Sequence, residues 1–189
     1  TEAEAGTLAV SSGGSVNAGT LTATTGDVSV TAKKDATIGT LNAKSVSAKA
    51  GTTLSAKTLD VKEHAALTSG GAMEVIDANV GSVAAKAGTT LHVKKLTSTG
   101  EATLTSKDEA KLDDVTAGTL AAESTAGSVN AGTLTAKTGN ASVTAKTDVK
   151  IDALKAEAGS ASIEATDGAL GVTTLNAKSL TAKAGTTLS

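Results

Sequence analysis

An apolar residue returns to the same place in a repeating pattern every 18 to 21 residues along most of the chain. The positions in this series are Leu21, Leu41, Leu59, Ala78, Leu96, Val115, Leu134, Leu154 and Leu175. A period of this length is typical of solenoids, in which each repeat forms a coil that buries its apolar side by stacking on its neighbours. A functional site in such a chain would be a departure from the repeat.

Each repeat contains three short segments in which apolar residues occupy positions i and i+2. This spacing places both side chains on one face of a β-strand. Representative pairs are Leu21/Ala23 and Leu154/Ala156 in the first segment, Val28/Val30 and Ala161/Ile163 in the second, and Val16/Ala18 and Val149/Ile151 in the third. Ser98 is the one polar residue in this inward series. We expect its hydroxyl to be buried against a backbone carbonyl at the corner before Ala102; the alternative is that the turn at 98–101 carries it into solvent.

Many pairs combine a large and a small residue, and neighbouring repeats can reverse the order. Ala65/Leu67, for example, follows Val46/Ala48. Close packing requires filled volume more than fixed identity, so we expect large side chains to face small ones. Two positions after the second pair every repeat has a small residue, which predicts a crowded corner: Ala32, Ala50, Ser69, Ala87, Ser106, Ser124, Ala145, Ala165 and Ala184.

These patterns predict an all-β fold, a right-handed parallel β-helix with three short strands in each coil of about 19 residues and nine to ten coils. The right hand is the default for parallel crossovers. Residues 1–189 are expected to form a single β-helix segment, and stacking at about 4.8 Å per coil makes a rod of roughly 45 Å. The absence of Phe, Tyr and Trp requires a narrow core that aliphatic side chains can fill.

Two stretches of the chain are duplicated. Residues 14–35 recur with few changes at 127–148, and residues 40–55 recur at 174–189. The two offsets differ by the length of one coil, so whole coils were gained or lost between copies. We expect the chain to be a segment excised from a longer repeat region, with uncapped ends that favour end-to-end self-association.

Charge and hydropathy argue against two classes of partner. The formal net charge is -2, and lysines and acidic residues are mixed along the chain. No basic stretch attracts nucleic acid, and no apolar run approaches the length of a membrane span. We therefore expect neither nucleic-acid binding nor membrane insertion.

The sequence presents no pattern of catalytic, cofactor-binding or metal-binding residues, and we do not expect an enzyme. Both histidines, His64 and His92, are expected on the solvated surface, and His92 points outward because it lies between inward Leu91 and Val93. No spacing of histidines and carboxylates supports a zinc site. The carboxylates are scattered and arginine is absent, whereas β-helical enzymes that cleave carbohydrates need charged groups clustered on one face.

The densest acidic stretch spans residues 107–114. Its carboxylates are Asp108, Glu109, Asp113 and Asp114. They permit a weak calcium contact, but the interpretation that we favour is a solvated corner balanced by Lys107 and Lys111. The glycine-rich nonapeptide of calcium-binding β-rolls is missing.

Rows of threonine on a β-helix face could also order water, as an ice-binding surface does. The motif Thr-X-Thr occurs at Thr20-Leu21-Thr22 and Thr133-Leu134-Thr135. The equivalent positions elsewhere hold Thr40/Asn42, Thr58/Asp60, Lys95/Thr97, Ala153/Lys155 and Thr174/Asn176, so the array is interrupted. Separately, Asn140-Ala141-Ser142 matches a glycosylation sequon.

Coils of about 19 residues with the phrase AGTL, at 18–21, 117–120 and 131–134, resemble the repeats of filamentous haemagglutinin, an adhesin of the two-partner secretion family. In that family such repeats form the β-helical shaft of an exported surface protein. The resemblance implies a structural shaft that projects distal modules from a bacterial surface, with a secreted or cell-surface location. The alternative is an outer face that itself binds a ligand, such as a host receptor or a glycan.

Overall fold

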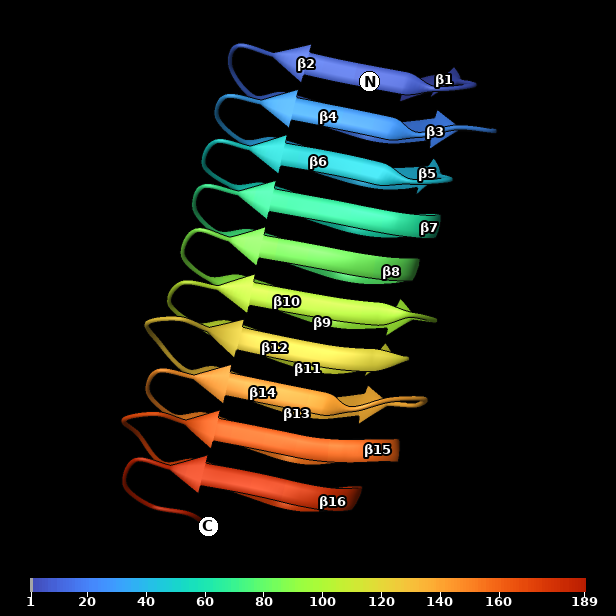
Figure 1. Ribbon diagram of the computed structural model, residues 1–189. Helices are drawn as coiled ribbons and strands as arrows, with labels where there is room; N and C mark the ends of the chain where they lie inside the picture. The colour runs from blue at the N-terminus through green and yellow to red at the C-terminus, as the bar shows by residue number, and fades with distance from the viewer. Residues whose placement is uncertain (1) are drawn as a thin grey trace.

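The computed structural model describes residues 2–189, which form strands joined by turns and contain no helix. The strands stack as coils of about 19 residues in a parallel β-solenoid of about ten turns (Figure 1). The strands are β1 (Glu2–Ala5), β2 (Leu8–Ser12), β3 (Val16–Ala23), β4 (Val28–Ala32), β5 (Ala36–Ala43), β6 (Val46–Ala50), β7 (Leu54–Ser69), β8 (Met73–Ala87), β9 (Leu91–Ser98), β10 (Glu101–Ser106), β11 (Ala110–Ala117), β12 (Thr119–Ser124), β13 (Val129–Ala136), β14 (Ala141–Ala145), β15 (Val149–Ala165) and β16 (Leu170–Ala184).

The pairings between these strands are all parallel. In Figure 1 the chain runs leftward along the nearer strands and returns behind them one coil lower, which is a right-handed path from the N-terminal to the C-terminal end. The predicted all-β fold, a right-handed parallel β-helix, is confirmed.

The three predicted segments form three faces, but two of them share a strand. In β3, Val16 and Ala18 are buried, then Gly19 and Thr20 both face outward, and burial resumes at Leu21. This break in the alternation bends the strand around a corner, and its pairing with β5 skips Gly19 and then continues in the same register. The third segment of one repeat and the first of the next are therefore one bent strand. In β7, β8, β15 and β16 the second segment continues it as well.

The core is a stack of aliphatic layers in the predicted register. Leu154 is fully buried, and its Cα partners in the adjacent coils are Leu134 and Leu175. In the second segment Val46 lies opposite Ala65, and the next inward position pairs Ala48 with Leu67. At these two positions large residues face small ones across neighbouring coils, as the sequence predicts, whereas the row of Leu134, Leu154 and Leu175 stacks large residues on one another.

The small residues after the second pair form one continuous row at a corner. From Ala32 to Ala165 every member of this row is buried. Their successive pairing brings the turns that follow so close together that a Cβ built on Gly70 would overlap the carbonyl oxygen of Gly51 in the preceding coil. The expectation of a crowded corner is confirmed.

Ser98 is buried, with 3% of its surface exposed. Its hydroxyl donates to the carbonyl oxygen of Gly81 in the preceding coil at 3.1 Å and lies 3.4 Å from the carbonyl oxygen of Glu101. The Glu101 carbonyl is the one directly before Ala102. The buried arrangement, rather than the solvent-exposed alternative, is therefore correct.

Candidate functional site

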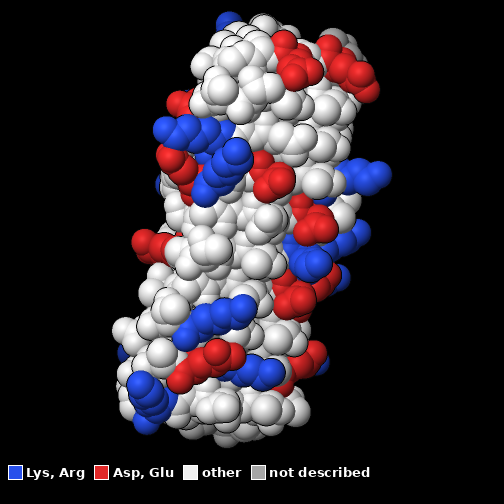
Figure 2. All heavy atoms as spheres, turned by 90° about the vertical axis from the view of Figure 1, so that its right-hand side faces the viewer, with Lys and Arg blue, Asp and Glu red and all other residues white. Residues whose placement is uncertain are grey.

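The stacking of coils arranges outward side chains in rows along the rod. In one row the Cα partners Asp77, Lys95 and Asp114 alternate in charge over three successive coils. Thr58 and Thr133 continue this row on either side. Charges of both signs are interspersed over the surface that Figure 2 displays, so that no single-sign stripe runs along it.

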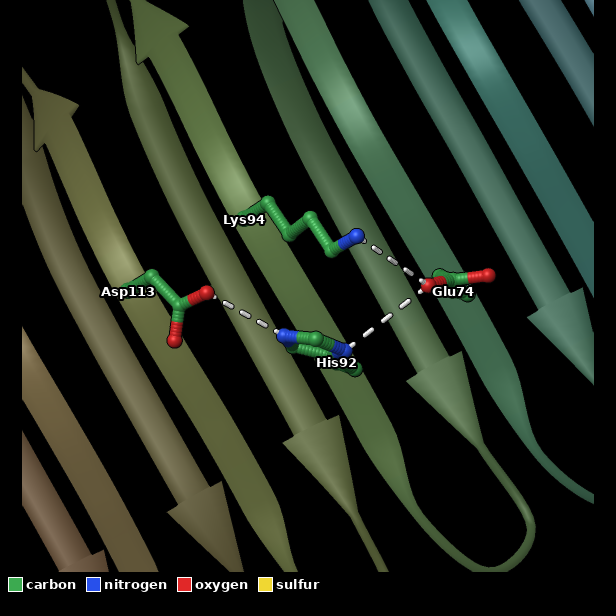
Figure 3. Close-up of polar contacts among 4 residues, drawn as sticks. All are labelled: Glu74, His92, Lys94 and Asp113. Carbon is green, nitrogen blue, oxygen red and sulfur yellow. Dashed lines mark hydrogen bonds and ion pairs between the residues drawn. The ribbon is translucent and has the colours of Figure 1, made fainter.

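The most connected polar group on the surface surrounds His92 on β9 (Figure 3). Its Nε2 lies 3.2 Å from Oδ2 of Asp113 on β11, and its Nδ1 lies 3.8 Å from Oε1 of Glu74 on β8. Lys94 Nζ lies 3.9 Å from the same Glu74 oxygen. A neutral imidazole has one N–H, so only the protonated ring can donate toward both carboxylates.

Solvent access limits what this group can do. The side chain of His92 is 28% exposed, and those of Glu74, Lys94 and Asp113 are 41 to 47% exposed. Ion pairs in such surroundings contribute roughly 0 to 1 kcal/mol each. No cleft excludes water from the histidine, and none of the surface grooves that we identify includes it. The geometry describes a solvated ion-pair network that ties three coils together.

The outward position predicted for His92 is confirmed, but its two carboxylate partners escaped the sequence analysis. Asp113 is 21 residues away from His92, and Glu74 lies opposite His92 in the preceding coil. A search for ligands within a few residues cannot find such neighbours. A search at the coil period would find them, because parallel stacking makes residues one coil apart adjacent.

His64 also lies on the surface, as expected. Its Nδ1 is 2.9 Å from Oγ of Ser82 in the next coil, and both residues belong to an exposed corner of the rod. A single serine hydroxyl does not provide the carboxylate or second imidazole that a metal site or a catalytic pair would require.

The acidic residues of 107–114 have separate partners. Glu109 accepts a hydrogen bond from Asn130 Nδ2 at 2.7 Å, Asp113 faces His92, and Asp114 lies beside Lys95. Within residues 2–189, no group of three or more histidine, cysteine, aspartate or glutamate side chains is placed to hold a metal ion. The structure offers no convergent calcium cage in this stretch.

The threonine rows are interrupted in three dimensions as they are in sequence. Thr20, Thr40 and Thr58 are neighbours in one row, which then continues with the charged residues from Asp77 to Asp114. The parallel row holds Thr22, Asn42, Asp60, Asn79, Thr97, Thr116, Thr135, Lys155 and Asn176. The regular spacing that an ice-binding face would need extends over only a few coils.

The face formed by the second segment carries two outward rows along the rod. One of its outward rows contains only small side chains: Ala9, Ser29, Ser47, Ala66, Ala84, Thr103, Ala121, Ser142, Ser162 and Thr181. Energetically dominant contact residues at protein interfaces are most often Trp, Tyr and Arg, and this sequence has none of them. The row has no projecting anchor for a partner.

A groove of about 350 Å³ lies where the first and second segments meet, and its lining includes Thr24 and Thr25, Lys44, and the corner residues Lys62 and Glu63 of β7. Lys44 Nζ is 3.5 Å from Oε1 of Glu63. The groove is open, and both charged groups are more than half exposed. Its only hydrophobic lining residues are Ala23 and Ala43, so it has none of the large aliphatic or aromatic side chains that usually hold a small ligand.

Asn140 of the sequon is exposed, but its side chain is engaged within the rod. Its Oδ1 accepts a hydrogen bond from the backbone N–H of Ser160 at 2.9 Å. Ala141, the middle residue of the sequon, begins β14 and is fully buried. Attachment of a sugar at Asn140 would have to preserve or replace the bond to Ser160.

Comparison with known proteins identifies no relative: no family model, curated protein or solved structure matches the chain. Nor is any helix of residues 2–189 long and apolar enough to cross a membrane.

Proposed function

We propose that this chain is a structural shaft segment of a secreted or cell-surface fibrous protein, and that it holds distal functional modules away from the cell. The observation that carries this proposal is the continuity of the two hydrogen-bonded ladders. One follows the second segments from β2 to β16, and the other follows the bent strands from β1 to β16. Each coil rests on a filled aliphatic layer, so the coils form one continuous body.

The surface supports a mechanical role over a binding role. The polar contacts between coils are mostly exposed ion pairs and hydrogen bonds within the rod, such as Lys146 with Asp167 at 2.7 Å. The open groove beside Lys44 is lined by no large aliphatic or aromatic side chain, and the row of small side chains lacks anchors. A structural shaft requires neither a ligand-binding groove nor anchor residues for a partner.

Distances between spin labels test the shaft directly. The chain has no cysteine, so Thr20→Cys with Thr174→Cys labels two outward positions of one row, eight coil steps apart. At about 4.8 Å per step we expect a narrow distance distribution near 38 Å. The control pair Thr20→Cys and Thr133→Cys spans two steps fewer and should give a mean about 10 Å shorter. A broad distribution for either pair would contradict a stiff shaft.

The proposed location at a bacterial surface is supported by the resemblance to filamentous haemagglutinin repeats. Antibodies against the outward rows should label intact cells that produce the protein, and external protease should remove the signal. Labelling only after cell lysis would overturn the proposed location. Binding of the isolated rod to host glycans, lost on Lys44→Ala and Glu63→Ala substitution, would instead favour the ligand-binding alternative.

A further inference from the structure

One outward row on the face formed by the second segments has a charge pattern that reverses in sign at its middle. Seven successive coils contribute, as Cα partners, Lys49, Thr68, Lys86, Thr105, Glu123, Thr144 and Glu164. Lysine alternates with threonine on one side of Thr105, and glutamate alternates with threonine on the other. The second segments lie side by side along the near face of the rod in Figure 1. Opposite charges therefore stand at equal distances from Thr105.

The rod itself leaves most of these charges without partners. Lys49, Lys86 and Glu123 are exposed, and within residues 2–189 none of them forms an ion pair. The threonine between them keeps the Cα positions of Lys86 and Glu123 two coils, or about 9.6 Å, apart. A groove of about 550 Å³ has both side chains and Thr105 in its lining. The two charges are thus presented to solvent beside a recess.

Glu164 is the one member of the row that has a partner within the rod. Its Oε1 lies 2.8 Å from Nζ of Lys183 in the following coil. A carboxylate can accept hydrogen bonds at both of its oxygens, so this pair does not prevent a second lysine from approaching Glu164.

A two-fold rotation makes this row complementary to itself. When the axis runs along the strand direction at Thr105, a second copy lies face to face with the first, with its coils in reverse order. Each outward row then faces the same row of the other copy. Lys86 of one copy lies opposite Glu123 of the other, and Lys49 lies opposite Glu164. Parallel rods would instead place lysine opposite lysine and glutamate opposite glutamate.

The other outward row of this face permits the two rods to approach. It contains only small side chains, and the same rotation places Ala84 opposite Ala121 and Thr103 opposite its own copy. Stacked sheets pack about 10 Å apart, a gap that a lysine and a glutamate side chain can bridge together. The small side chains and the charged side chains therefore suit one separation of the rods.

The size of the contact predicts a weak complex. From Lys49 to Glu164 the face measures about 34 Å along the rod and about 16 Å along its five-residue strands, which gives roughly 550 Å² per copy. The total of about 1,100 Å² lies at the lower end of the range for specific interfaces. Two corner residues also oppose the contact: Glu101 begins β10 and Lys107 follows it, so each lies nearest to its own copy at the axis.

We infer that two copies of this chain pack side by side in opposite directions through the face formed by the second segments, with the two-fold axis at Thr105. The contact is isologous and closes on itself, so its product is a dimer. Opposite charges at matching positions select the antiparallel direction. The inference goes beyond the proposed shaft function and does not depend on it.

Reversing one charge at a time tests the inference. In sedimentation equilibrium at low salt, the 18.1 kDa chain should approach twice its mass as its concentration rises, and added salt should return it to the monomer. Lys86→Glu and Glu123→Lys each create two like-charge contacts across the axis. Each variant alone should therefore remain monomeric where the unmodified chain is mainly dimeric. Their equimolar mixture has opposite charges at both contacts and should restore the dimer.

Two further variants separate this face from a general effect of charge. Lys111→Glu makes the same change at an exposed position of β11, on another face, and should dimerise as the unmodified chain does. Glu101→Gln removes a like-charge contact at the axis and should strengthen the dimer. Circular dichroism checks that all variants remain folded.

Cross-linking through introduced cysteines reports the direction of the rods. Sheets about 10 Å apart are too distant for a disulfide, so a short bis-maleimide is used. The chain has no cysteine, and Thr105→Cys places a single thiol at the axis, where it should cross-link to its own copy. Thr68→Cys and Thr144→Cys each lie about 19 Å along the rod from their own equivalents. They should cross-link only when the two variants are mixed.

Three results would overturn the inference. An unmodified chain that stays monomeric at millimolar concentration would assign the face to a partner other than a second copy. A mixture of Lys86→Glu and Glu123→Lys that stays monomeric would exclude the proposed charge pairs. Cross-linking of Thr68→Cys to its own copy would indicate parallel rods.

Discussion

The duplicated coils at 14–35 and 127–148 place nearly the same residues in two different neighbourhoods. Their inward residues behave alike: Leu21 is 2% exposed and Leu134 is fully buried. Their outward residues do not. Asn130 donates to Glu109 in the coil above, whereas no described residue occupies the equivalent place beside Asn17. Burial is thus a property of the repeat, and surface contacts are a property of what stacks next to it.

The contacts of the turn at the end of each copy also depend on the neighbouring coil. Asp35 Oδ1 accepts from the N–H of Thr53 at 3.2 Å, and Asp148 Oδ1 accepts from the N–H of Ala169 at 2.7 Å. The neighbouring coil adds a hydroxyl in the first copy only, because Thr52 precedes Thr53. In the second copy the residue before Ala169 is a glycine.

The two copies should differ most in the free energy of unfolding that is lost when their equivalent leucines are replaced by alanine. Leu134→Ala leaves a cavity between Val115 and Leu154, and we expect it to reduce the free energy of unfolding by about 2 to 5 kcal/mol. Leu21→Ala should cost less, because its Cα partner Ala3 is smaller than Val115, the partner of Leu134, so Leu21 has fewer side-chain atoms to lose contact with. Urea denaturation measures both, and equal losses would contradict the comparison.

A smaller effect should distinguish two serines of the crowded corner that precede the second copy. Ser124 Oγ donates to the carbonyl oxygen of Asp108 and accepts from the N–H of Gly127 at 3.2 Å. Its replacement by alanine should cost about 1 kcal/mol. Ser106 Oγ is buried without a hydrogen-bond partner, so Ser106→Ala should be neutral or stabilising. Thermal melting of the two variants compares them, and a larger loss for Ser106→Ala would refute this assignment of roles.

Asp35, in the turn that ends the first copy, should make the free energy of unfolding depend on pH. The hydroxyl of Thr52, and next the N–H of Thr53, lower the pKa of the Asp35 carboxyl from its ordinary value. A lowered folded-state pKa contributes stability above the unfolded-state pKa, about 3.9, and that contribution is lost as pH falls through the folded-state pKa. Asp35→Asn should therefore be less stable than the unmodified chain at pH 7. The difference in free energy of unfolding should decrease as the pH falls.

Thr52→Val is the control for this titration, because it removes the first donor and keeps the N–H of Thr53. At pH 7, Thr52→Val should lower the free energy of unfolding by less than Asp35→Asn does. A stability difference between Asp35→Asn and the unmodified chain that is constant from pH 7 to pH 2 would contradict the role of ionised Asp35.

Replacing the equivalent outward asparagines, Asn130 and Asn17, should give the smallest difference in free energy of unfolding between the copies. Asn130→Ala removes the 2.7 Å hydrogen bond to Glu109 at an exposed site, and we expect a loss of no more than about 0.5 kcal/mol. Asn17→Ala removes no such bond to a preceding coil and should have less effect. Chemical denaturation of both variants, compared with Glu109→Ala, shows whether the cost of Asn130→Ala depends on its partner.

The sequence correctly predicts those features that depend on local spacing. Pairs at i and i+2 place Leu154 in the core, and the small residue after each second pair marks the crowded corner. It predicted separate strands at every corner, whereas the bent β3 shows that two outward residues can turn the chain within one ladder. It also missed the partners of His92, since Glu74 and Asp113 become neighbours only through stacking.

The sequence by itself determined the period, the inward register and the aliphatic core, because the alternation of strand residues and the demand for filled volume act within one repeat. Only the tertiary structure decided which outward side chains meet and where the ladders continue around corners. Those features depend on the number of residues in each turn, which sets how one coil lies on the next.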